Sequence, residues 1–133
     1  EKAISFIRNS ERFYPGLIQL YIDAEEYQRA LSFIDKLRAK EPNSIDLYFQ
    51  AVMVHLENND VDSAFDEFER AIDNKLYDKD LVSFINIAAQ EHNQIDRGIA
   101  LLEKCKPLDK EGIIPNYIEA LKHIKDNKLE SIN

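Results

Sequence analysis

The sequence predicts an all-α fold, a solenoid of stacked antiparallel helix pairs, and three observations lead to this prediction. Similar segments recur along the chain with a period of about 34 residues, which is typical of helical repeat proteins. Within these segments apolar residues are three or four positions apart, which places them on one face of a helix. The 133 residues include only 3 Gly and 4 Pro, too few for the many turns of a sandwich or barrel. The length suits a single domain covering residues 1–133.

The second helix of each predicted pair repeats most clearly. Residues 25–43 align with residues 59–75 and 93–109 when the chain is shifted by one period and then by another. The aligned columns are Tyr27, Val61 and Ile95; Ala30, Ala64 and Gly98; Ile34, Phe68 and Leu102; and Leu37, Ala71 and Cys105. Small residues in the second column allow two helices to approach closely, and bulky residues in the third column fill the space beside that contact.

The first helix of each pair repeats more loosely. Runs with helical periodicity that end in polar turn residues cover 12–24, 45–59, 79–93 and 113–127. The last run follows the loop 106–112, and residues 1–10 are typical of the end of a preceding helix. The sequence therefore predicts about seven helices. Because the chain begins with Glu1 rather than Met, we expect it to be part of a longer protein.

This pattern resembles the tetratricopeptide repeat family. The matching residues are Tyr14, Leu17, Tyr21, Tyr27, Ala30 and Pro42 in the first repeat, Tyr48, Ala51, Ala64, Phe68 and Ala71 in the second, and Ile85, Ala89, Gly98 and Leu102 in the third. The resemblance implies a right-handed α-α superhelix of about three repeats. The implied repeats are 11–44, 45–78 and 79–112, with a terminal helix at 113–126.

Some residues depart from the family pattern. Ile18, Val52 and Asn86 stand where a small residue is usual, and Leu76 and Lys110 replace the closing Pro. We therefore expect the helix packing and the curvature to differ from those of a typical member.

The composition limits the classes of partner. The net charge of −8, from 25 acidic and 17 basic residues, repels phosphate. Lys36, Arg38 and Lys40 come nearest to a basic patch but are flanked by acidic residues, so we expect no nucleic-acid partner. No run approaches the ~18 apolar residues of a membrane-spanning helix, and we expect no membrane insertion. A single cysteine is typical of a protein in a reducing compartment, and we therefore expect a cytoplasmic location. The abundance of Lys, Asn and Ile is typical of proteins from AT-rich bacterial genomes.

The sequence offers no constellation for catalysis. Cys105 shares the packed column of Leu37 and Ala71, which indicates a buried small side chain rather than a nucleophile. The acidic stretch 60–69 lacks the Gly and the closing Glu spacing of a calcium loop. The three histidines, His55, His92 and His123, stand in different repeats without metal-ligand spacing. We therefore expect no catalytic residue, no metal and no cofactor, and a protein that is not an enzyme.

The family resemblance implies that ligands bind a concave groove formed by the first helices. The residues expected to bind a partner there are Gln19, Ile22, Phe49, Met53, Leu56, Ile87 and Tyr117, and the wider groove set adds Pro15, Ser83, Gln90, Leu121 and Ile124. Phe49 and Met53, four positions apart, form the natural anchor, because Met adapts to a partner and Phe supplies rigid area. The positions that hold a chaperone's carboxylate in one subclass are here Pro15, Gln19, Gln50, Asp80 and Phe84. None of them is basic, so that ligand is not expected.

The sequence therefore predicts a protein–protein interaction scaffold that binds an apolar or amphipathic segment, with basic flanks that suit the negative charge. Two alternatives stay open. One is self-association into a homodimer, through the apolar strip or through the end of the solenoid at residues 1–10. The other is a regulatory or docking domain of a longer enzyme.

Overall fold

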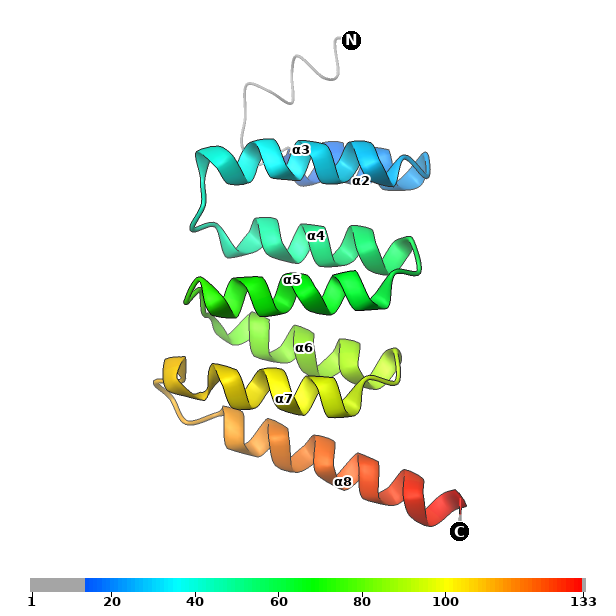
Figure 1. The fold of residues 1–133 in the computed structure, drawn as a ribbon, viewed down its shortest axis with the longest axis vertical. Coiled ribbons are helices and arrows are strands. Elements are labelled where there is room, and N and C mark those ends of the chain that lie inside the picture. Colours follow the sequence, from blue (N-terminus) through cyan, green and yellow to red (C-terminus); the bar gives the residue numbers. More distant parts are fainter. Residues whose placement is uncertain (1–13, 133) are drawn as a thin grey trace. The chain divides into compact units, whose positions relative to one another are not determined.

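The computed structural model describes residues 14–132, and side chains from residue 16 to 128. Seven α-helices and one 3₁₀-helix occur in this part of the chain, and none of these residues forms a strand (Figure 1). The helices are α2 (Tyr14–Asp23), α3 (Tyr27–Lys40), α4 (Ile45–Glu57), α5 (Val61–Asp73), α6 (Lys79–Glu91), α7 (Ile95–Cys105), η2 (Lys106–Leu108) and α8 (Ile114–Ile132). The predicted all-α class is confirmed. The segment 1–10, predicted to end a preceding helix, lies outside the described residues.

The chain divides into two compact units, residues 1–67 (unit 1) and residues 68–133 (unit 2), with the boundary inside α5. In unit 1, α2 packs on α3 and α3 on α4; in unit 2, α6 packs on α7 and α7 on α8. Helices two apart also meet, α2 with α4 and α6 with α8. Within each unit, neighbours in sequence are thus neighbours in space, as in helical repeat proteins.

The helix starts reproduce the sequence period. The second helices α3, α5 and α7 begin at Tyr27, Val61 and Ile95, each one full period after the one before. The first helices α4 and α6 begin at Ile45 and Lys79, which are separated by the same period. The columns inferred from the sequence therefore correspond to equivalent positions on equivalent helices.

The turns within the helix pairs share one backbone geometry. Glu25, Asn59 and Asn93, which are equivalent positions of the three repeats, have positive φ angles of 58°, 58° and 56°. After α2, the N–H of Glu25 bonds to the carbonyl of Ile22 and the N–H of Glu26 bonds to that of Tyr21, at 2.9 and 2.8 Å. This is a Schellman motif, which satisfies the last carbonyl groups of a helix through one left-handed residue.

The core of unit 1 is formed by apolar side chains from α2, α3 and α4. The buried members are Ile18, Ile22, Ala30, Ile34, Leu37, Leu47, Ala51 and Val54, with Tyr21, Tyr27, Leu31 and Phe33 packed against them. Ala30, the small residue of the repeated column, is fully buried, as close helix packing requires.

Unit 2 combines an aromatic pair with a close helix contact. The rings of Phe68 and Phe84 meet edge to face, with centroids 5.1 Å apart. On α7, Gly98 approaches α6 so closely that a Cβ atom at this position would lie 2.6 Å from the Cβ of Ala89. The two helices can pack at this distance only because residue 98 has no side chain.

The last helix is longer than predicted. The sequence predicts a helix at 113–126, and α8 extends to Ile132 because no Gly or Pro interrupts it. Its start is organised by the Asp109 carboxylate, which accepts hydrogen bonds from the N–H groups of Gly112, Ile113 and Ile114 at 3.0, 3.2 and 2.9 Å. The Tyr77 hydroxyl donates to the same carboxylate at 3.3 Å, so the linkers before α6 and α8 are joined.

Candidate binding surface

Two exposed apolar side chains lie at equivalent positions of two first helices. Met53 on α4 is 40% exposed, and Ile87, one period later on α6, is 51% exposed. Most other large apolar side chains of these helices are buried or half-buried. The repeat therefore presents apolar area to solvent at the same place in each unit.

The other predicted binding residues differ in accessibility. Gln19 is exposed, and its Nε2 donates to Asp23 Oδ1 at 2.8 Å. Phe49 and Leu56 are half-buried and flank Met53 on α4. Tyr117 on α8 is half-buried, and its hydroxyl lies 3.2 Å from the Ser83 hydroxyl on α6.

Ile22 does not lie on an exposed surface. It is 6% exposed and belongs to the core of unit 1. The physical reason is its position four residues after Ile18, which is fully buried, because residues i and i+4 share a helix face. Leu121, in the wider groove set, is also fully buried. Both side chains stabilise packing and are not available to a partner.

Sequence reasoning missed the carboxylates beside the exposed apolar residues. On α4, Asp46 and Glu57 are exposed, seven residues before and four residues after Met53. On α6, Asp80 and Glu91 are exposed at the same distances from Ile87. The signal was present in the sequence, since Asp46 aligns with Asp80 and Glu57 aligns with Glu91 when the chain is shifted by one period.

Leu20 on α2 was also not predicted. It is 53% exposed, although the equivalent Val54 and Ala88 on α4 and α6 are buried. Val54 packs in the core formed with α2 and α3, the preceding pair of helices. The side of α2 that carries Leu20 therefore corresponds to a side that is covered on the later first helices.

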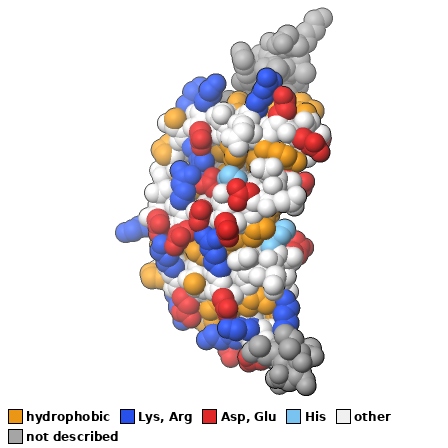
Figure 2. Space-filling model, turned by 45° about the vertical axis from the view of Figure 1, so that its right-hand side comes forward, with side chains coloured by type: hydrophobic (Ala, Val, Ile, Leu, Met, Phe, Trp, Pro, Cys, Tyr) orange, Lys and Arg blue, Asp and Glu red, His pale blue; other side chains and the backbone are white. Residues whose placement is uncertain are grey.

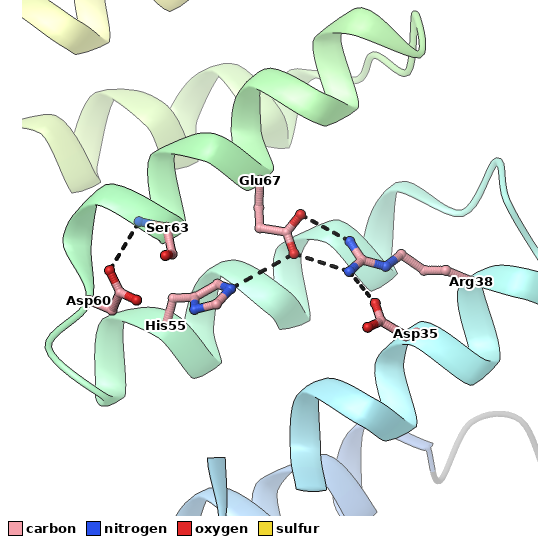
Figure 3. A network of polar contacts seen from close by, with 6 residues as sticks. All are labelled: Asp35, Arg38, His55, Asp60, Ser63 and Glu67. Atoms are coloured by element: carbon pink, nitrogen blue, oxygen red, sulfur yellow. Dashed lines mark hydrogen bonds and ion pairs between the residues drawn. The ribbon is translucent and has the colours of Figure 1, made fainter. Parts of the chain in front are cut away.

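A buried polar cluster joins three helices of unit 1 (Figure 3). Arg38 on α3 donates a hydrogen bond from Nη1 to Glu67 Oε1 on α5 at 3.2 Å, and its Nη2 forms an ion pair with Glu67 Oε2 at 3.1 Å. The Glu67 side chain is only 5% exposed, and His55 Nε2 of α4 lies 3.9 Å from it. The Arg38 guanidinium also contacts Asp35 at 2.6 Å and lies over the Tyr48 ring.

Burial acts to lower the pKa of Arg38, but the bonds to Glu67 and Asp35 raise it above its ordinary value. Arg38 therefore stays charged, and the cluster holds helices together rather than offering a free base.

The cysteine side chain is withdrawn from solvent. Cys105 is fully buried, as its column predicted. Burial, followed by the nearby Asp109 charge, raises the pKa of Cys105 to about 11. Since the thiolate is the reactive form, the side chain is unreactive at neutral pH.

Among the described residues, no group of three or more His, Cys, Asp or Glu side chains is arranged to hold a metal ion. No helix in the same part of the chain has both the length and the apolar character needed to cross a membrane. Basic and acidic side chains are interspersed on the face that Figure 2 shows.

In comparisons with known proteins, no family model matches this chain and no curated protein matches it.

Proposed function

We propose that this chain is a non-catalytic interaction scaffold, similar to tetratricopeptide repeat proteins, that binds a peptide or helix of a partner protein on the exposed faces of its first helices. The observation that carries the proposal is the equivalent exposure of Met53 and Ile87. Exposed apolar side chains are common singly, but the same position exposed in successive repeats indicates a repeated use.

The faces around these residues suit an apolar ligand. On α4, Phe49 and Leu56 extend the apolar area of Met53, and both retain solvent access. A methionine side chain adapts to the shape of a ligand, while an aromatic ring supplies rigid contact area. The exposed apolar side chains of α4, bordered by polar residues, suit a ligand that binds as a helix in a groove or as an extended peptide.

The proposed absence of catalysis rests on the side chains that could have supplied it. Cys105 is buried with a raised pKa, and the Glu67 carboxylate is bound by Arg38. Neither group is presented to a substrate in the way that a nucleophile or a general base must be.

The test compares two double variants as baits. Met53→Glu/Ile87→Glu places a charge at each exposed apolar position, and we expect loss of the partner that the unchanged protein captures from cells of the source organism. Ser32→Glu/Ala100→Glu is the matched control, because these exposed positions are also equivalent, on α3 and α7, and receive the same charge. Circular dichroism verifies equal helix content. Equal capture by the two variants would reject the first-helix faces as the binding site.

Self-association is a second candidate, and the exposure of Leu20 favours it. A second copy that covers this side of α2 would bury the position in the way that Val54 and Ala88 are buried. We expect a mass that rises with concentration in sedimentation equilibrium and a strictly monomeric Leu20→Glu variant. A monomer at every concentration for the unchanged protein would exclude this candidate.

A further inference from the structure

Exposed carboxylates form one edge of the first-helix face of α4. This face consists of Asp46, Phe49, Gln50, Met53, Leu56 and Glu57. At about 100° per residue, Asp46 and Glu57 lie on one side of Met53, whereas Phe49 and Leu56 lie on the other side. The face is therefore divided into an acidic edge and an apolar edge, with Met53 between them.

The acidic edge has no cation from the described part of the chain. Asp46 and Glu57 form no ion pair with any residue that the structure describes. The two arginines of α3 are engaged elsewhere, since Arg29 pairs with Glu26 and Arg38 pairs with Asp35 and Glu67. Two carboxylates beside exposed apolar area, without such partners, are an electrostatic complement for an external cation.

The net negative charge of unit 1 also favours a basic ligand. Unit 1 contains 13 acidic and 7 basic residues, a net charge of −6, whereas unit 2 contains 12 acidic and 10 basic residues, a net charge of −2. A basic ligand is attracted to unit 1 over distances up to about 10 Å at ordinary salt.

We propose that the first-helix face of α4 recognises a basic amphipathic protein segment. Its apolar side chains pack on Phe49, Met53 and Leu56, while Lys or Arg side chains next to them pair with Asp46 and Glu57. This inference rests on the proposed function, and it specifies the chemistry of the partner and the residues that select it.

The probes are three fluorescein-labelled peptides of about 15 residues, a length at which helices become possible. The first has Leu and Lys at helical spacing, the second has Glu in place of Lys, and the third has Ser in place of Leu. Fluorescence anisotropy measures Kd for each peptide at low and high salt. We expect the Leu–Lys peptide to bind most tightly, with an affinity that falls as salt screens the charges.

Two kinds of variant separate the apolar and the acidic contributions. Met53→Ser removes apolar contact area, and we expect Kd to rise about tenfold. Glu57→Gln removes one carboxylate, and Kd should rise about threefold at low salt. Glu41→Gln is the matched control, since it makes the same change of net charge in unit 1 at an exposed position outside the face. It should leave Kd within error of the unchanged protein.

The outcomes distinguish the two proposals. Weaker binding by Met53→Ser and by Glu57→Gln, but not by Glu41→Gln, supports both. If Met53→Ser weakens binding but Glu57→Gln and Glu41→Gln have equal effects, the apolar face survives and the acidic edge is rejected. Binding that none of the variants changes, or a failure of the Leu–Lys peptide to bind better than its Glu counterpart, overturns the inference.

Discussion

The two units build the same repeat with different interactions. Unit 1 joins its helices through a buried ion pair between Arg38 and Glu67, whereas unit 2 relies on the aromatic pair Phe68–Phe84 and on the close contact at Gly98. In unit 2, by contrast, the ion pair between Lys104 and Glu69 is exposed, since each of the two side chains is 43% exposed. Removing one partner of a buried ion pair costs much stability, because it leaves the other charge buried and uncompensated. An exposed ion pair contributes little to the free energy of unfolding. The units should therefore respond differently to the same chemical change.

The largest effect is expected from Glu67→Gln. The change leaves the Arg38 guanidinium buried without its main anion, and we expect a loss of about 3 kcal/mol in the free energy of unfolding. Glu69→Gln, two residues later on the same helix, removes only a solvent-exposed contact and should leave the stability nearly unchanged. Urea unfolding measures both effects. Equal losses of stability in the two variants would contradict the expectation that the buried pair of unit 1 matters more than the exposed pair of unit 2.

The converse sensitivity of unit 2 is tested by Gly98→Ala. The new methyl group would lie 2.6 Å from the Ala89 Cβ, so α6 and α7 must separate. We expect a net loss of about 1–2 kcal/mol, because the cost of overpacking exceeds the gain in helix propensity. Adding Ala89→Gly removes the opposing methyl group and should restore part of the stability beyond the sum of the single changes. A neutral Gly98→Ala would contradict the close contact.

A smaller effect is expected where the repeats share a turn. Glu25 adopts the left-handed conformation that Asn59 and Asn93 adopt in the later repeats, and Asn tolerates it better than Glu. Glu25→Asn should therefore stabilise unit 1 by about 0.5 kcal/mol, and Asn59→Glu should destabilise by a similar amount. Thermal unfolding shows whether each variant raises or lowers the unfolding temperature. If both variants change it in the same direction, the shared turn geometry is contradicted.

The smallest effect is a pH dependence in unit 2. Burial acts to raise the pKa of Asp109, but hydrogen bonds from Ile114, Ile113 and Gly112 lower it below its ordinary value of 3.8. A lowered folded-state pKa contributes stability that is present above pH 3.8 and is lost as the pH falls through the folded-state value. The stability difference between the unchanged protein and Asp109→Asn should therefore shrink on acidification. Urea unfolding at several pH values measures it, and a difference independent of pH would exclude this role.

Periodicity made the helices predictable, because equivalent apolar columns must face equivalent cores. Tyr27, Val61 and Ile95 mark the same helix start in sequence and in structure, and the burial of Cys105 follows from its column. The Arg38–Glu67 pair could not be predicted, since its members are far apart in the sequence and only the packing of α3 on its neighbours brings them together. The burial of Ile22 could not be derived from the family register either, because it depends on how α2 is turned toward its own core.

The position of Cys105 has a practical consequence. It is the only cysteine of the chain, and it is fully buried in unit 2. A thiol reagent can modify it only when α7 opens locally. The rate of modification therefore reports how often this part of the fold unfolds locally. The modification rate of Cys105 therefore measures the local opening of unit 2 without an engineered cysteine. A partner that stabilises unit 2 would lower this rate.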